Sequence, residues 1–213
     1  MKTESKGMPI TGVFSKLYDR YNTLGGFGQA FRQQIVDEVS LKHGESALDC
    51  GCGTGTLAII VKREVGPGGD VHGIDLSADQ LAIARRKIQK EGLDIGLHEG
   101  SIDELPFPDE SFDAIFSTLM LHHVPETVKR SAFREMHRVL KPGGRIVVVD
   151  FGPPKHTWGW IVFAPLLVMF LATPSTRDNL FNRLPEMMSD AGLHITEHKI
   201  IKEVAHVIKA DRG

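Results

Sequence analysis

The sequence has few cysteines, no block of like charges and no long apolar run at its start. Its two cysteines are too few for a secreted fold stabilised by several disulfides, so we expect the protein to occupy a reducing compartment. The 25 Lys and Arg residues against 27 Asp and Glu give a net charge of −2 with no basic block, which disfavours a general nucleic-acid binder. Residues 1–12 (MKTESKGMPITG) lack the apolar core of a signal peptide. The sequence therefore predicts a cytoplasmic globular protein.

Residue patterns along the 213-residue chain predict strands that alternate with helices. Two strand-like runs at the end have no helix between them. The pattern indicates one α/β domain with a doubly wound, mostly parallel sheet and an antiparallel C-terminal edge. Helices are predicted at 27–43, 57–65, 78–91 and from Pro125 to just before Gly143, and strands at 47–50, 71–75, 95–98, 112–117, 145–151, 194–201 and 204–210.

A glycine-rich turn at 49–55 (DCGCGTG) follows the first predicted strand and opens a helix. Glycines let the backbone approach a ligand closely, at the edge where open α/β sheets bind nucleotides. Asp75 ends the next predicted strand, where a carboxylate can accept both hydroxyls of a ribose. A tight turn with a surface aspartate is the alternative interpretation. The third glycine is Gly55, one place earlier than the dinucleotide fingerprint requires, which counts against NAD.

Longer motifs extend this pattern. Residues 47–55 (ALDCGCGTG) resemble the first motif of class I S-adenosylmethionine-dependent methyltransferases. Residues 15–22 (SKLYDRYN), 105–113 (LPFPDESFD), 117–124 (STLMLHHV) and 138–144 (RVLKPGG) are similar to the branch that holds ubiquinone/menaquinone C-methyltransferases and many small-molecule methyltransferases. The resemblance, over residues 14–151, implies a Rossmann-like fold with a seven-stranded sheet.

The resemblance also implies how a single methyltransferase domain, residues 1–213, is organised. Its parts would be an N-terminal helical cap, a cofactor-binding core, a substrate-side insertion and C-terminal strands, at 1–44, 45–151, 152–193 and 194–213.

S-adenosylmethionine is the cofactor that the resemblance implies, and S-adenosylhomocysteine the product. Gly51 and Gly53 would face the methionine portion, Asp49 would place its amino group, and Asp75 would hold the ribose. Ser101 stands where the family usually has an acidic residue for the adenine amino group. The full predicted cofactor-binding set is Tyr18, Asp49, Gly51, Cys52, Gly53, Asp75, Leu76, Gln80, Ser101, Ile102, Ser117 and Leu119.

Methyl transfer from a sulfonium is an in-line displacement, which requires a base only if the acceptor must first lose a proton. The candidate catalytic residues near predicted strand ends are His156, Tyr18, His122 and Asp150. His156 is preferred because it lies close to the strand end where substrates should enter. For His122 the alternative is a histidine that bonds nearby backbone at a strand-to-loop corner. Adjacent side chains diverge on a strand or helix, so we expect at most one of His122 and His123 to face the cleft.

Cys50 and Cys52 have no further ligands at zinc spacing, so no metal site is predicted. They are interpreted instead as small residues that fill a tight turn.

Residues 158–172 (WGWIVFAPLLVMFLA) carry no charged side chain. The stretch is shorter than the ~20 residues that cross a bilayer, and Pro165 interrupts it. It could form the wall of a pocket for a hydrophobic or lipid-like acceptor, a homodimer interface, or a surface in peripheral contact with a membrane. We favour the acceptor pocket.

The sequence therefore predicts a methyltransferase that acts on a hydrophobic small molecule. Nucleic-acid methylation is disfavoured, because the Asn/Asp-Pro-Pro-Tyr motif is replaced by Ser-Thr-Leu-Met at 117–120. A non-catalytic cofactor-binding or interaction module remains an alternative, as does a dinucleotide-dependent oxidoreductase.

Overall fold

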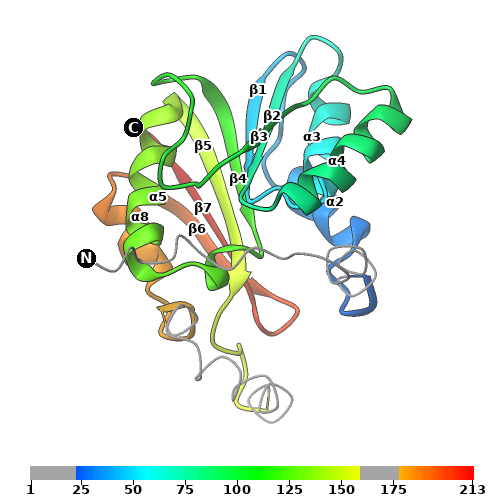
Figure 1. Cartoon of the computed structure of the whole chain (residues 1–213). Helices are drawn as coiled ribbons and strands as arrows, with labels where there is room; N and C mark the ends of the chain where they lie inside the picture. The colour runs from blue at the N-terminus through cyan, green and yellow to red at the C-terminus, as the bar shows by residue number, and fades with distance from the viewer. Residues whose placement is uncertain (1–22, 159–177) are drawn as a thin grey trace, which may run out of the picture.

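The computed structural model describes residues 23–158 and 178–213. Its strands form one seven-stranded sheet in the order β3-β2-β1-β4-β5-β7-β6 (Figure 1). The predicted site residue Tyr18, its neighbour Tyr21 and residues 159–172 of the apolar stretch lie outside the described residues. The strands are β1 (Ser46–Cys50), β2 (Asp70–Asp75), β3 (Gly96–Glu99), β4 (Phe112–Thr118), β5 (Leu140–Phe151), β6 (His194–Ile201) and β7 (Ala205–Asp211). The helices are α2 (Gln29–Asp37), α3 (Thr56–Val65), α4 (Ala78–Glu91), the 3₁₀ turn η1 (Leu121–His123), α5 (Glu126–Val139) and α8 (Leu184–Asp190).

The first five strands are parallel, and their order reverses between β1 and β4. Ala47 of β1 is paired with Val71 of β2 on one side and with Ala114 of β4 on the other. The chain therefore runs outward from β1 through β2 to β3 and then crosses back to β4. In open α/β sheets such a reversal leaves a crevice at the carboxyl ends of the two central strands, where ligands bind.

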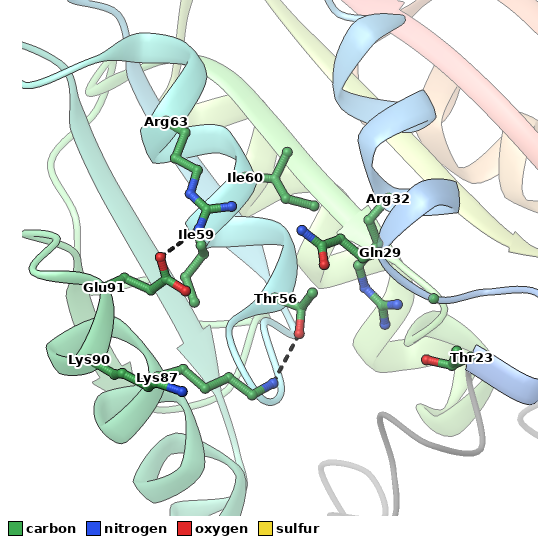
Figure 2. A pocket seen from close by; sticks show the side chains of 11 residues that line it. Thr23, Gln29, Arg32, Thr56, Ile59, Ile60, Arg63, Lys87, Lys90 and Glu91 are labelled. Atoms are coloured by element: carbon green, nitrogen blue, oxygen red, sulfur yellow. Dashed lines mark hydrogen bonds and ion pairs between the residues drawn. The ribbon is translucent and has the colours of Figure 1, made fainter.

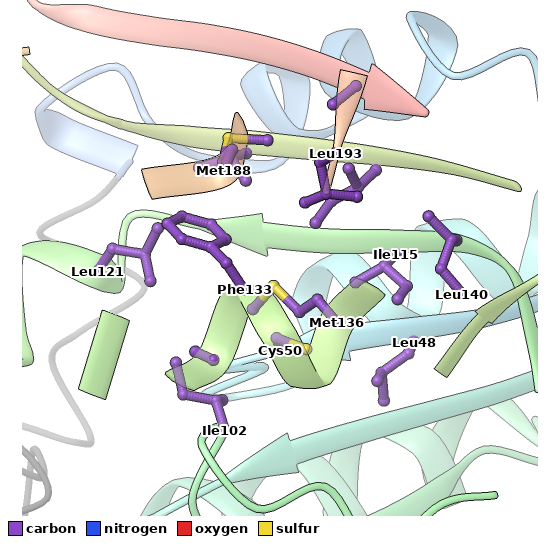
Figure 3. Close-up of a cluster of buried hydrophobic side chains, with 14 of the residues drawn as sticks. Leu48, Cys50, Ile102, Ile115, Leu121, Phe133, Met136, Leu140, Met188 and Leu193 are labelled. Carbon is purple, nitrogen blue, oxygen red and sulfur yellow. The ribbon is translucent and has the colours of Figure 1, made fainter. Parts of the chain in front are cut away.

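Helices cover both faces of the sheet, with α2, α3 and α4 on one face and α5 and α8 on the other (Figure 1). Successive residues of β1 are buried on opposite sides: Ala47 packs toward α2 and α3, while Leu48 belongs to the cluster beneath α5. Figure 3 shows that second cluster, in which Phe133 and Met136 of α5 meet residues of the sheet. Burial on both faces explains why the central strands are almost wholly apolar.

The C-terminal edge confirms the predicted antiparallel hairpin. β7 lies between β5 and β6, with Val148 of β5 opposite Ile208 of β7. The residue patterns explain this order, because β7 is buried along most of its length whereas β6 alternates exposed and half-buried positions. The more apolar strand occupies the interior place and the amphipathic one forms the edge.

Several predicted boundaries differ in the structure. The helix predicted to end just before Gly143 ends at Val139, because β5 begins at the next residue. The helix predicted through His43 ends at Asp37, and Ser40 has a φ of 51°. Arg145 of β5 donates to the carbonyls of Val39 (2.7 Å) and Ser40 (3.1 Å), which holds the chain in a turn after the helix. The strand predicted from Arg145 begins five residues earlier, at Leu140, with an irregularity in its pairing to β4.

Among the described residues, no helix combines the length and the apolar character that crossing a bilayer requires.

Candidate functional site

The glycine-rich turn connects β1 to α3 at the reversal of strand order. Gly51 and Gly55 have φ values of 75° and 74°, a region that residues with a Cβ rarely adopt. A Cβ on Gly51 would lie 2.3 Å from Cγ of Met120, and one on Gly55 would lie 2.9 Å from Cβ of Ala84. The motif predicts that these glycines let the backbone approach a ligand closely. The structure adds that they also allow close packing against β4's following loop and α4.

Asp75, at the end of β2, holds the glycine-rich turn in place. Its two carboxylate oxygens accept hydrogen bonds from the backbone N–H groups of Gly53 (2.9 Å) and Ser77 (2.8 Å). Burial raises the pKa of Asp75, and these two hydrogen bonds oppose the rise. A carboxylate has about four acceptor positions, so it can bind the two amides and still accept from a ligand hydroxyl.

Ser77 and Gln80, at the start of α4, form half of a capping box. The Ser77 hydroxyl accepts from the backbone N–H of Gln80 at 3.3 Å, which caps the helix. The Ser77 N–H, which the Gln80 side chain would otherwise bond, donates to Asp75 instead. Gln80 is buried, and neither polar atom of its side chain has a partner within the described part of the chain.

Other buried polar atoms at this edge of the sheet also lack partners among the described residues. They are Oδ2 of Asp49, the hydroxyl of Ser117 and the hydroxyl of Thr118. Asp49 and Ser117 are the penultimate residues of the neighbouring strands β1 and β4, in which Cys50 is paired with Ser117. An unpaired buried polar group is costly, about 1–3 kcal/mol, so native proteins rarely keep several together without a ligand or water. Together with Gln80, these atoms mark a site for a polar ligand.

Asp49 is the most perturbed acid of this site. Burial raises its pKa to about 7, while the charge of Arg32 and a hydrogen bond from the Ala58 N–H oppose the shift and the charge of Asp75 adds to it. The Ala58 amide belongs to the first turn of α3, so one oxygen of Asp49 binds the helix, while Oδ2 has no partner among residues 23–158 and 178–213. A carboxyl group in this state gains a full charge when a cationic group binds it.

Arg32 and Thr118 were not predicted from the sequence. Both line a small hollow over the glycine-rich turn, which Asp49 and Gly51 also line. Arg32 is 7% exposed and donates to the carbonyl of Phe27. An arginine beside the buried Phe31, Ile35 and Val36 of α2 was the available signal, because charged residues are rarely buried without a role.

A larger hollow of about 320 Å³ lies between α2, α3 and α4 (Figure 2). Arg32 and Thr56 line both hollows, so the two are neighbours. Lys87 reaches across and donates to the hydroxyls of Thr54 (2.9 Å) and Thr56 (3.0 Å) at the start of α3. On the far side, Arg63 pairs with Glu91 at 2.5 Å.

The remaining predicted cofactor residues lie around the same edge. Leu76 is half-buried next to Asp75, and Leu119 is buried with a φ of 53°. Ile102 is part of the core beneath α5. The buried hydroxyl of Ser101 donates to the carboxylate of Asp103, so its lone pairs remain for an external donor. Burial raises the pKa of the Cys52 thiol well above its ordinary value, with Asp49 adding to the rise, so the thiol is neutral.

The structure brings His122 and Asp150 together and leaves His156 apart. Nδ1 of His122 lies 2.7 Å from Oδ1 of Asp150 at the ends of β4 and β5. The prediction that the side chains of His122 and His123 diverge is wrong, because the 3₁₀ turn brings their ring centroids to 3.9 Å from each other. Nδ1 of His156 lies 2.8 Å from Oε1 of Glu203, on a side chain that is 51% exposed.

Fold and site together define an α/β protein with a site for a polar ligand at the reversal of its strand order. The Methyltransferase domain family matches residues 47–144. A demethylmenaquinone methyltransferase of Halalkalibacterium halodurans is 37% identical over 158 residues, which are 71% of this chain and 64% of that protein. Another, of Listeria welshimeri, is 36% identical over 164 residues, 74% of this chain and 68% of that protein. The chain thus matches about two thirds of the length of these relatives.

A crystal structure of an S-adenosylmethionine-dependent methyltransferase from Aquifex aeolicus has the same fold. Its TM-score is 0.73 at 21% identity, over 93% of this chain and 97% of that chain. This chain belongs to the family of S-adenosylmethionine-dependent methyltransferases. The predicted family, fold class and cofactor are thereby confirmed, and the relatives favour them over a dinucleotide-dependent oxidoreductase.

Proposed function

We propose that this chain transfers a methyl group from S-adenosylmethionine to a hydrophobic small-molecule acceptor by in-line displacement. The observation that carries the proposal is the group of buried polar atoms on Asp49, Gln80, Ser117 and Thr118 that have no partner in the described part of the chain. A ligand with amino, carboxylate and hydroxyl groups can pair with atoms of this kind, which an apolar ligand cannot. The residues present therefore fit the family's cofactor.

The polar groups of the cofactor can be matched with side chains of this site. Oδ2 of Asp49 would accept from the amino group, and Arg32 is the nearby cation suited to the carboxylate. Asp75 would accept from the ribose while it holds the turn. Ser101 would accept from the adenine amino group. When bound, the cofactor supplies a methyl group already activated by its sulfonium, so the protein's task is alignment and exclusion of water.

The relatives support an acceptor of quinone type. Two are named demethylmenaquinone methyltransferases, and this chain carries the apolar stretch 158–172 after its fifth strand. We infer that the acceptor is a hydrophobic ring compound such as reduced demethylmenaquinone. A homodimer and peripheral membrane contact through 158–172 stay predictions, as does the absence of a nucleic-acid partner.

Calorimetric titration with S-adenosylhomocysteine tests the cofactor site. We expect micromolar binding by the wild type, no comparable binding of NADH, and loss of binding in Asp75→Ala. Asp94→Ala is the matched control, because Asp94 is an exposed acid at the turn between α4 and β3. Equal binding by both variants, or a preference for NADH, would contradict the proposed site.

Release of S-adenosylhomocysteine tests catalysis. The wild type, supplied with S-adenosylmethionine and a short-chain reduced demethylmenaquinone, should release the product continuously and yield the methylated ring. If it binds the cofactor but releases no product with hydrophobic acceptors, the non-catalytic alternative is favoured.

A further inference from the structure

His122 and Asp150 form a buried pair at the carboxyl edge of the sheet. Asp150 is the penultimate residue of β5, its side chain is fully buried, and Oδ1 lies 2.7 Å from Nδ1 of His122. The same carboxylate accepts from two backbone N–H groups, those of Phe151 (2.7 Å) and His122 (3.3 Å). Burial favours the neutral carboxyl, but His122 and these bonds outweigh it and hold the pKa of Asp150 below its ordinary value. Asp150 is therefore an ionised acceptor.

An ionised Asp150 fixes which ring nitrogen of His122 carries hydrogen. A carboxylate only accepts, so the hydrogen of neutral His122 lies on Nδ1 and the lone pair lies on Nε2. This arrangement is the one in which an imidazole takes up a proton at Nε2 and a carboxylate stabilises the resulting cation.

The elements beneath the pair are buried and joined by hydrogen bonds. Leu121, the first residue of η1, is fully buried in the core with Phe133 (Figure 3). The Leu119 N–H donates to the carbonyl of Val149 at 2.7 Å, which ties the end of β4 to β5. His122 thus lies in η1, shortly after the end of β4, where the buried hydroxyls of Ser117 and Thr118 lack partners among the described residues.

The titratable groups around the pair leave Asp150 as the acid partner of His122. His123 packs against it, and burial, with a contribution from His122, lowers the pKa of His123 to about 4, so His123 is neutral near pH 7. From α5, Lys129 is a cation near Asp150, but its Nζ is bonded to Asp178 and Asn179. From β7, His206 bonds the carbonyl of Pro153, and burial lowers its pKa. Asp150 is therefore the one acid hydrogen-bonded to His122 within the described residues.

A positioned general base is useful only for some classes of methyl acceptor. An amine that already has a free lone pair needs no base to accept a methyl group from a sulfonium. A carbon of an aromatic ring is a poor nucleophile until an attached hydroxyl loses its proton. We propose that His122 is the general base of this methyltransferase, that Asp150 is its positioning residue, and that the acceptor is an aromatic or enolic carbon activated by a hydroxyl group. This inference rests on the proposed function.

The proposed step balances in atoms and charge. Nε2 of His122 takes the hydroxyl proton, and the electron pair of that O–H bond moves into the ring. The ring carbon forms its bond to the methyl group while the methyl–sulfur bond breaks, and the electron pair of that bond stays on sulfur. The resulting ketone then loses its ring proton to water, and His122 returns its proton to the oxygen. One proton is released per methyl group transferred.

The test uses the full chain with S-adenosylmethionine and a short-chain reduced demethylmenaquinone, over a range of pH. We expect His122→Gln to lower turnover by about 10²- to 10⁴-fold while S-adenosylhomocysteine binding stays within about twofold of the wild type. The wild-type rate should show a one-proton acid limb that His122→Gln lacks. In Asp150→Asn the limb should move to lower pH, because the cation loses its carboxylate. His194→Gln, an exposed histidine on β6, is the control and should behave as wild type.

Any other result refutes one named part of the proposal: the base, the acceptor class or the positioning role of Asp150. Wild-type turnover with an unchanged acid limb in His122→Gln refutes the base. Turnover of the dimethyl ether of the acceptor, which has no hydroxyl proton, refutes the acceptor class. A wild type that binds S-adenosylhomocysteine but does not methylate hydroxylated rings refutes the acceptor class and the proposed function together. If His122→Gln does not bind the product, the pH profile of Asp150→Asn tests the base instead, because this variant is closest in shape to the wild type. If the acid limb of Asp150→Asn then lies at the same pH as that of the wild type, the proposed roles of His122 and Asp150 are refuted.

Discussion

Asp49→Asn should remove most of the pH dependence of cofactor binding and should stabilise the unliganded protein. Burial raises the pKa of Asp49 to about 7, against the opposing charge of Arg32. A bound ammonium group favours the carboxylate form, so the wild type must ionise Asp49 to bind well. Asparagine has nothing to ionise, and its affinity should be weaker but nearly constant with pH.

The size of the binding effect follows from the pKa. If only the ionised form binds, the apparent Kd is proportional to 1 + 10 raised to the power (pKa − pH). With a pKa of about 7, this predicts roughly tenfold tighter binding at about pH 8 than at about pH 6. Tenfold corresponds to about 1.4 kcal/mol. This is the upper limit, because a protonated Asp49 that still binds would reduce the ratio.

The effect on folding has the opposite sign. The folded pKa of about 7 lies above the ordinary value of 3.8, so the folded protein holds this proton over a range where the unfolded chain has lost it. Stability therefore falls as the pH rises through that range. About three pKa units at 1.4 kcal/mol each give a loss of at most about 4 kcal/mol above pH 7, which Asp49→Asn should largely recover.

Two measurements check this reasoning. Titration with S-adenosylhomocysteine between about pH 6 and pH 8 gives the binding ratio, and urea unfolding without ligand gives the stability. Asp113→Asn is the control of opposite sign: burial raises the pKa of Asp113, but Lys141 and Ser46 lower it below its ordinary value, so its loss should destabilise by about 0–1 kcal/mol. Wild-type affinity that does not change with pH, or an equal pH dependence in Asp49→Asn, would refute the assignment.

Three further predictions concern the turn and the core. Gly51→Ala should destabilise by about 1–3 kcal/mol in urea unfolding, because its φ is 75° and the new Cβ would displace Met120; an unchanged midpoint would contradict this. In Asp75→Asn only one of the two side-chain positions can accept a hydrogen bond, so the backbone amide of Gly53 or Ser77 should exchange hydrogen faster. The affinity for S-adenosylhomocysteine should fall at least about tenfold. Slow exchange at both amides would contradict the role of Asp75 in holding the glycine-rich turn. Lys129→Met leaves the buried Asp178 with one cation fewer, and a loss of about 3 kcal/mol or more in thermal unfolding is expected; no loss would mean the pair is neutral to stability.

Local patterns determined most of the fold. Alternation of strands and helices, the glycine-rich turn and the two adjacent terminal strands predicted the mostly parallel sheet with its antiparallel edge, because burial on one or two faces dictates where apolar residues recur. Boundaries were less well determined. The end of α2 depends on Arg145, which is 105 residues from Ser40 in sequence, and no local pattern contains that contact.

The site divides in the same way. Asp49, Gly51 and Asp75 were predicted because strand ends and glycines carry a local signal and because their motif is similar to a known family. Only the tertiary structure decided that Arg32 lies beside Asp49 and that His122 pairs with Asp150, 28 residues further along. Parallel strands β4 and β5 bring these last two together through a helix that crosses over the sheet. Chemistry that arises from residues distant in sequence depends on that crossover, and a single sequence read locally does not reveal it.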